Sequence, residues 1–305
     1  MNVLIVGNGQ MGQAVARVGS FRGHKSSFFT SRDERSQFLA RAAENDVVCI
    51  AISTHDTGEA ALGYILDAMR AGKPVALCEK GSLAYHFDEI RPYLGRIGYT
   101  AAAGGASGML SLFSFPHLGL ERIIGIVNGS LNFEFSECAR NKDPYQVYSY
   151  IQRLGLCEPE KGSSLSGFVN GEVRDIVLKA SIIFNRSGIS DETLSASEFG
   201  EICLFEDEVL RQLARKSMRF VVSIAKKPNP AIDDHLYDCL RVRKGEWHIE
   251  IGLAHMSLLP FCPFPERQQN ALVIEDYAGS TQITGIGAGP IPTAATMIMD
   301  AQNLV

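Results

Sequence analysis

The first hundred residues alternate between two hydrophobic patterns. Short apolar runs typical of buried strands occur at 2–7, 26–31, 46–53, 74–79 and 99–104. Between them, apolar residues recur at helical spacing in 10–21, 34–45, 58–72 and 87–98. Strands that alternate with helices of this length predict βαβ units and a parallel sheet. The pattern therefore predicts an α/β, doubly wound nucleotide-binding domain.

The pattern changes after Gly104. A strand-like run at 122–131 is followed by helical patterns over 132–218, and strand-like runs return at 219–225, 246–256, 270–277 and 280–289. Helices followed by strands predict a second domain of the α+β class. The last segment, 290–305, is typical of one closing helix with Pro292 near its first turn.

The first strand leads into three glycines. Gly7, Gly9 and Gly12 follow the G-x-G-x-x-G spacing and come between a predicted strand and a predicted helix. Glycines here permit a tight turn and a close approach of the backbone to a pyrophosphate, which the helix N-terminus attracts. We therefore expect dinucleotide binding, and we expect Gln10, Met11 and, after the third strand, Ser53 to line the same site. A purely structural glycine turn is the alternative.

Cofactor choice depends on the end of the second strand. Ser31 and Arg32 stand where an acid that binds the ribose hydroxyl is usually sought. A guanidinium and a hydroxyl can hold a 2'-phosphate, so the sequence favours NADP, with NAD possible. In the alternative, Arg32 is solvated and Asp33 takes the ribose.

Two lysines are candidates for chemistry. Lys80 follows a buried run, 75–78, and the carboxyl ends of parallel strands border the ligand crevice. Asp175 and Lys179 are four residues apart on a predicted helix whose apolar face is Val173, Ile176, Val177, Ala180 and Ile183. If this pair faces a cleft, the ammonium can exchange a proton with a carbonyl or alcohol oxygen. Otherwise each lysine is an ordinary solvated side chain.

Composition excludes several classes. The chain of 305 residues has 46% hydrophobic residues and a net charge of −5, which argues against a general nucleic-acid binder. Seven scattered cysteines without a C-x-x-C pair favour reduced core thiols over a disulfide frame or a zinc site. No apolar run is long enough for a membrane helix, and the start "MNVLIVG" is typical of a strand, not a signal peptide. We expect a cytoplasmic protein.

Several passages together resemble homoserine dehydrogenase. "GIVNGSLNF", "GIGAGPIPTAATMIMD" and "AGKPVALCEKGSLA" match the Asn-Gly, Gly-Ala-Gly and lysine passages of that family, and "LGLCEPE" and "DIVLK" occur in the family's order. The resemblance implies a Rossmann domain over 1–103 completed by 287–305. It also implies a catalytic and dimerising region over 104–286, and hence a homodimer.

The resemblance further implies the reversible NAD(P)-linked conversion of aspartate semialdehyde, a small amino-acid substrate, to homoserine in amino-acid biosynthesis. Lys80 and Lys179 match the active-site lysines, with Lys179 the proton donor and Asp175 beside it. Glu158 matches the glutamate that holds the substrate amino group. The substrate and nicotinamide region would be lined by Asn128, Gly129, Gly287, Ala288 and Gly289.

Three departures affect what can be carried over. Thr100 replaces a glutamate near the family's monovalent-cation site, so we assign no metal ligand, and Gly108 replaces a proline. Between 160 and 175 the charges change and residues are inserted. A different amino aldehyde, keto acid or amino acid is therefore an alternative substrate. A nucleotide-binding regulatory protein without catalysis is the alternative of another class.

Overall fold

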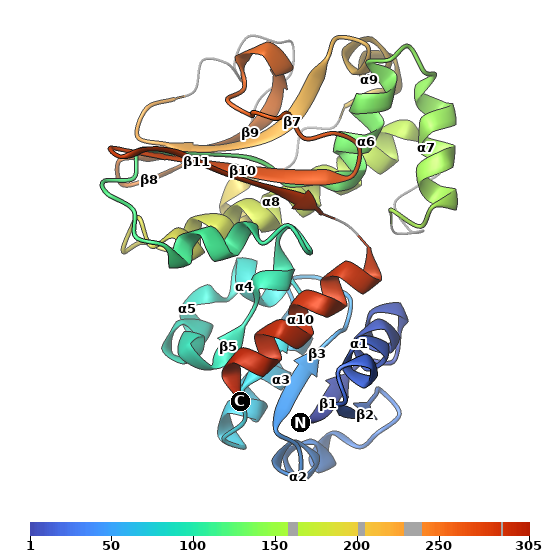
Figure 1. Cartoon of the computed structure of the whole chain (residues 1–305), viewed down its shortest axis with the longest axis vertical. Coiled ribbons are helices and arrows are strands. Elements are labelled where there is room, and N and C mark those ends of the chain that lie inside the picture. The colour runs from blue at the N-terminus through green and yellow to red at the C-terminus, as the bar shows by residue number, and fades with distance from the viewer. Residues whose placement is uncertain (158–163, 201–204, 229–239, 288) are drawn as a thin grey trace. The chain divides into compact units, whose positions relative to one another are not determined.

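The computed structural model divides the chain into two compact units. One contains Met1–Ala106 and Gly289–Val305, and the other contains Ser107–Ala288 (Figure 1). The structure describes residues 1–157, 164–200, 205–228, 240–287 and 289–305.

The first unit contains a parallel sheet in the order β2-β1-β3-β4-β5. Apart from the exposed Asn2 at the start of β1, the residues of β1, β3 and β4 are apolar and buried on both faces, as expected for a parallel sheet that helices cover. The doubly wound fold class is therefore confirmed. Its strands are β1 (Asn2–Val6), β2 (Lys25–Phe29), β3 (Val47–Ile50), β4 (Val75–Leu77) and β5 (Ile97–Gly98), and its first helices are α1 (Gln10–Phe21), α2 (Phe38–Ala43), α3 (Glu59–Arg70), α4 (Gly81–Tyr85) and α5 (Phe87–Ile90).

The closing helix α10 (Pro290–Leu304) belongs to the same unit, as the fold prediction required. Its buried residues Ala294, Met297 and Ile298 join the core formed by β1, β3 and α1. Asp300 accepts hydrogen bonds from the backbone and the hydroxyl of Thr100, at 2.8 and 2.6 Å. Thr100, which replaces the family glutamate, therefore ties the C-terminal helix to the unit.

One predicted strand was wrong. The run at 99–104 does not form the fifth strand, because β5 ends at Gly98 and Thr100–Ala102 forms a 3-10 turn. The preceding helical pattern breaks into α5 and a 3-10 helix over Arg91–Arg96, where Pro92 lies in the first turn. The apolar run over 99–104 packs as a turn instead of pairing as a strand.

The second unit contains an antiparallel sheet in the order β11-β10-β6-β7-β9-β8. The segment from Leu259 to Phe264 packs an apolar cluster onto the sheet, and α6 and α8 also contact sheet strands. Strand β8 was missed, because its half-exposed, basic sequence LRVRK lacks an apolar run. The elements are β6 (Arg122–Ile126), α6 (Gly129–Cys138), α7 (Pro144–Arg153), α8 (Leu165–Ser187), α9 (Asp207–Ala214), β7 (Met218–Ala225), β8 (Leu240–Lys244), β9 (Trp247–His255), β10 (Gln269–Asp276) and β11 (Gly279–Ile286).

Among the described residues, no helix combines the length and the apolar composition needed to cross a bilayer.

Candidate functional site

The glycine turn between β1 and α1 has the geometry that a dinucleotide site requires. Gly7 has φ +103°, and a Cβ there would lie 2.7 Å from the Ala51 carbonyl oxygen. A Cβ on Gly12 would lie 2.0 Å from the Gly7 carbonyl oxygen, so α1 can pack closely only on a glycine. Gly9 has no atom within 4 Å of its would-be Cβ, and as N-cap it leaves the first N–H groups of α1 without a side-chain cap. The turn is thus packed on one side and open on the other, which fits a pyrophosphate.

The loop after β2 uses its acid internally. Asp33 accepts hydrogen bonds from the backbone and the hydroxyl of Thr30, at 2.6 and 2.9 Å, and pairs with Arg41 at 3.0 Å. The backbone hydrogen bond from Thr30 is the largest cause of the lowered pKa of Asp33. Both carboxylate oxygens are therefore engaged in closing the loop. The neighbouring Ser31 and Arg32 are exposed.

A buried acid organises the turn that carries Lys80. Glu79 is 2% exposed and accepts hydrogen bonds from Thr54 Oγ1 at 2.6 Å and from the backbone N–H of Gly81 and Ser82 at 2.6 and 2.9 Å. Its carboxylate thereby satisfies N–H groups at the start of α4. Lys80 is half-buried, and its N–H donates to Thr54 Oγ1 at 3.3 Å. The acid that follows β4 therefore fixes the turn that presents the lysine. Glu79 was assigned no role from the sequence, although an acid two residues before Gly81 and Ser82, just after a strand, is a usable signal.

In the second unit, β6 delivers the chain to α6 through Val127 and Asn128. Asn128 is the N-cap of α6, and its Oδ1 accepts from the Leu131 N–H at 2.9 Å. Its Nδ2 donates to Glu172 at 2.5 Å and to Asp175 at 3.0 Å on α8. Gly129 lies where a Cβ would be 2.6 Å from the Gln268 carbonyl oxygen, so the start of α6 packs against the chain entering β10. The Asn128 side chain thus holds two carboxylates in place.

The predicted pair Asp175 and Lys179 is a buried ion pair. The Lys179 ammonium lies 2.6 Å from Asp175 Oδ2, and the two side chains are 10% and 11% exposed. The same ammonium donates to the Val127 carbonyl oxygen at 2.9 Å. The predicted apolar face of α8 is buried as a whole, and the helix starts earlier than expected, at Leu165 after the N-cap Ser164. A charged lysine is tolerated here because it is paired and hydrogen-bonded.

Two further residues belong to this cluster and were missed. Glu172 is 4% exposed and shares the Asn128 carboxamide with Asp175. Its position three residues before Asp175 on one helix face was a signal that could have found it. Asn270, at the start of β10, is fully buried and donates to the Val127 carbonyl oxygen at 3.0 Å. No local pattern marks Asn270, because its partner is 143 residues away in sequence.

The remaining predicted residues have simpler placements. Gln10 and Ser53 are exposed and Met11 is half-buried. Gly287 packs against Asn270, and Gly289 is the N-cap of α10 with φ +123°. Glu158 and Ala288 lie outside the described residues, so their roles stay predictions. Within the described part of the chain, no group of three or more His, Cys, Asp or Glu is arranged to hold a metal ion.

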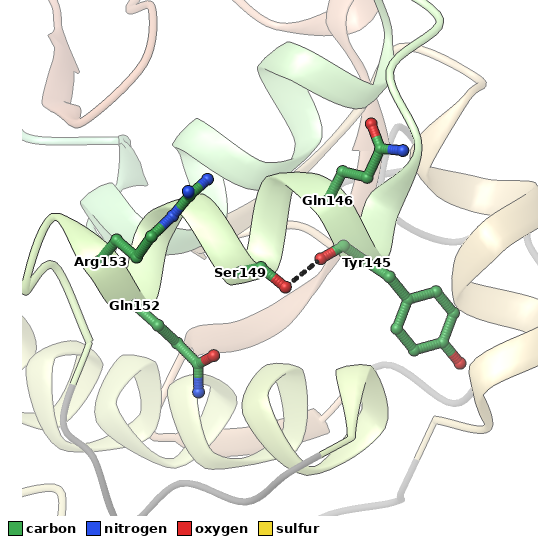
Figure 2. A pocket seen from close by; sticks show the side chains of 5 residues that line it. All are labelled: Tyr145, Gln146, Ser149, Gln152 and Arg153. Atoms are coloured by element: carbon green, nitrogen blue, oxygen red, sulfur yellow. Dashed lines mark hydrogen bonds between the residues drawn. The ribbon is translucent and has the colours of Figure 1, made fainter.

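A separate depression of about 810 Å³ lies over α7 (Figure 2). Within it, the Ser149 hydroxyl donates to the Tyr145 carbonyl oxygen at 2.8 Å. None of the predicted site residues lines it; the lining is Tyr145, Gln146, Ser149, Gln152 and Arg153.

The first unit has the Rossmann-type fold of a dinucleotide-binding domain, and the second is an α+β unit with a buried lysine and aspartate pair. The model of the family described as homoserine dehydrogenase matches residues 114–301, which is more than half of the chain. The chain therefore belongs to the homoserine dehydrogenase family, and the resemblance seen in the sequence is confirmed.

Individual relatives are distant. A homoserine dehydrogenase of Lactococcus lactis is 26% identical over 262 residues, which cover 81% of this chain and 55% of that protein. This chain thus spans about half the length of the curated relatives it matches. The structure of a homoserine dehydrogenase from Thermoplasma acidophilum has a TM-score of 0.73 at 16% identity, covering 100% of this chain and 98% of that one. A hyperthermophilic archaeal homoserine dehydrogenase in complex with NADPH has a TM-score of 0.68 at 18% identity, covering 99% and 97%.

Proposed function

We propose that this protein is an NADP-dependent oxidoreductase that interconverts L-aspartate 4-semialdehyde and L-homoserine. The observation that carries the proposal is the Lys179 ammonium, buried between the Asp175 carboxylate and the Val127 carbonyl oxygen in a member of this family. A lysine that acts as general acid toward a carbonyl oxygen does so as its ammonium, and a fixed position in a site with little water makes that proton transfer efficient.

Each residue has a proposed task. NADPH, when bound, supplies the hydride. Lys179 gives a proton to the aldehyde oxygen on reduction and takes it back from the alcohol in the reverse direction. Asp175 keeps the ammonium charged and in place, because its Oδ2 lies 2.6 Å from the nitrogen. Lys80, presented by the Glu79 turn, adds positive charge where negative charge develops on oxygen.

The substrate end of the site is proposed from the family motif. Glu158 would hold the substrate ammonium, and Gly129 would line the substrate region through its backbone, because the Gln268 carbonyl oxygen fills the space that a side chain there would need. Asn128 is proposed to act through the protein, since its carboxamide is used by Leu131, Glu172 and Asp175. We also propose a homodimer formed by the sheet of the second unit, in which β11 is the strand at one edge.

The choice of NADP rests on the loop after β2. Both oxygens of Asp33 accept hydrogen bonds from Thr30 or Arg41, so this acid is poorly placed to take a ribose hydroxyl. Ser31 and Arg32 are exposed beside it and can bind a 2'-phosphate. The NADPH complex of the archaeal relative supports the same cofactor. The open side of Gly9 and the uncapped start of α1 would take the pyrophosphate.

Glu172 favours a second candidate substrate. It places an additional buried carboxylate beside Asp175, within the segment that departs from the family pattern. A changed set of polar groups rejects one substrate and accepts another by large factors. A different amino aldehyde, keto acid or amino acid is therefore the alternative substrate for the same hydride chemistry.

The test follows NADPH absorbance as purified protein meets aspartate semialdehyde, with NADH in parallel. Lys179→Met should abolish turnover and leave NADPH affinity within about twofold, because the lysine acts on the chemical step. Lys226→Met is the matched control, since this exposed lysine forms an ion pair with Glu246 and has no role in the proposed site. Tight NADPH binding without turnover would reject homoserine chemistry and lead to a screen of other amino aldehydes and keto acids. Turnover that survives Lys179→Met would reject the role of the lysine.

A further inference from the structure

We infer that Asn270 is a positioning residue that fixes the Val127 carbonyl oxygen on which the Lys179 ammonium is held. The inference rests on the proposed function insofar as Lys179 is the proton donor. It is based on one observation: the Asn270 and Lys179 side chains donate to the same carbonyl oxygen.

Both donors reach the Val127 carbonyl from different elements. Asn270 Nδ2 on β10 lies 3.0 Å from the oxygen, and Lys179 Nζ on α8 lies 2.9 Å from it. A carbonyl oxygen has two lone pairs, so these two donors saturate it. With one lone pair taken by Asn270, the other lone pair sets the direction from which the ammonium can approach.

The Val127–Asn128 peptide is held at both ends. At one end the carbonyl oxygen binds Asn270 and Lys179, and at the other the Asn128 side chain caps α6 and holds Asp175. If Asn270 were removed, the peptide plane could rotate about its remaining contacts. The ammonium would then follow the carbonyl oxygen and leave its position by a fraction of an ångström or more, which is enough to slow a proton transfer.

Asn270 itself is locked by Gly287. A Cβ on Gly287 would lie 2.1 Å from Asn270 Cγ, so the carboxamide lies directly against the glycine backbone. The Gly287 N–H donates to the Gln268 carbonyl oxygen at 3.1 Å, which fixes the glycine to the chain entering β10. Gly287, predicted from the family motif to contact the cofactor, thus has a packing role in holding the carboxamide.

Packing alone does not account for an asparagine at this position. Asn270 is 0% exposed, and its Oδ1 has no hydrogen-bond partner in the described part of the chain. A buried carboxamide with an unused acceptor is costly, and an apolar side chain with the same branching, such as leucine, would avoid that cost. The donor group facing Val127 is therefore the feature that requires an asparagine.

The test compares Asn270→Leu and Asn270→Asp with Asn132→Asp. Asn132 is an equally buried asparagine on α6, whose Nδ2 donates to the carbonyl oxygens of Pro265 and Gln269 at 3.2 and 3.0 Å. Its Oδ1 also has no partner among the described residues, so it matches Asn270 in burial and in its unused acceptor but does not contact Val127. Melting temperatures identify any variant that fails to fold.

The two substitutions at Asn270 should give different signatures. Asn270→Leu should lower kcat by about 10- to 100-fold with KM within about twofold, because positioning affects the chemical step. Asn270→Asp should keep most of its kcat at low pH, where the neutral carboxyl donates to Val127, and lose it as that carboxyl ionises. Asn132→Asp should show neither change. An Asn132→Asp profile that copies the Asn270→Asp profile, or an Asn270→Leu protein with full kcat, would overturn the inference.

A measurement without substrate separates this inference from the proposed function. Nitrogen-15 NMR of lysine ammonium groups should show one signal that Lys179→Met removes. Asn270→Leu should shift or broaden this signal, and Asn132→Asp should leave it in place. An unchanged Lys179 signal in Asn270→Leu would overturn the positioning role of Asn270, even if the wild-type protein turned over no substrate. Absence of turnover alone would count only against the proposed reaction.

Discussion

Glu134 provides a test of the fold that does not depend on the proposed reaction. It lies on α6, is 1% exposed, and its Oε1 accepts only from Cys138 Sγ at 3.4 Å among the described residues. Its Oε2 has no partner in the described part of the chain. Burial raises the pKa of Glu134 from 4.5 to about 8, and the nearby Asp143 charge adds to this. We predict that Glu134→Gln stabilises the protein at alkaline pH.

The direction and the size of this stability difference follow from the linkage between proton binding and folding. The unfolded carboxyl ionises near pH 4.5, whereas the folded one keeps its proton up to about pH 8. Raising the pH through this window therefore favours unfolding, and the stability present below pH 4.5 is lost by about pH 8. At about 1.4 kcal/mol per pKa unit, the shift corresponds to roughly 5 kcal/mol of unfolding free energy. Glutamine has the same shape and does not ionise, so its protein should lose none of this.

The assay is urea unfolding of both proteins at several pH values from 4.5 to about 9. This range includes the ordinary pKa of 4.5 and the folded-state pKa of about 8 for Glu134. The unfolding free energies should agree at the acid end and diverge by several kcal/mol at the alkaline end. Glu137→Gln is the control on the same helix, because hydrogen bonding from Lys142 lowers the pKa of Glu137. This control should destabilise near neutral pH and converge with wild type in acid. If the unfolding free energies of Glu134→Gln and wild type changed in parallel with pH, the raised pKa of folded Glu134 would be wrong.

Three further predictions concern the cofactor and the ion pair. Arg32→Ala should raise KM for NADPH by about 10- to 100-fold, which corresponds to the loss of hydrogen bonds to a charged group, and should leave KM for NADH unchanged. Equal effects on both cofactors would contradict binding of the 2'-phosphate by Arg32. Asp175→Ala should lower the unfolding free energy in urea by about 3–5 kcal/mol because it strands a buried ammonium, while Glu246→Ala at the exposed Lys226 pair should cost under about 1 kcal/mol. Gly12→Ala should lower the melting temperature, because the new Cβ would lie 2.0 Å from a backbone oxygen. Gly9→Ala should keep the melting temperature, because nothing lies within 4 Å of its new Cβ, but should weaken NADPH binding measured by calorimetry.

Local patterns predicted the parts of the fold that short stretches determine. The βα rhythm, the glycine turn and the return of the closing helix were confirmed, and the buried face of α8 places Asp175 and Lys179 together at the predicted spacing. The catalytic role of these two residues remains a prediction, but their ion pair is a structural fact.

Features determined by distant partners could not be predicted in the same way. Asn270 and Val127 meet through a hydrogen bond 143 residues apart, and Glu172 reaches Asn128 across 44 residues. Strand β8 was missed because its half-exposed, basic sequence has no hydrophobic run. Its pairing with β9, which the local sequence does not reveal, is what makes it a strand. In the sequence Asp33 was the alternative ribose ligand, and only its contacts with Thr30 and Arg41 show how the carboxylate is used.

The central claim is that Lys179-dependent hydride transfer converts aspartate semialdehyde to homoserine. The most direct measurement incubates the protein with aspartate semialdehyde and NADPH deuterated at both C4 positions, then analyses the product by mass spectrometry. We predict homoserine that carries a deuterium at its hydroxyl-bearing carbon, formed by the wild-type and Lys226→Met proteins and absent with Lys179→Met. Bound NADPH that yields no deuterated homoserine, or equal labelling by Lys179→Met, would contradict the account.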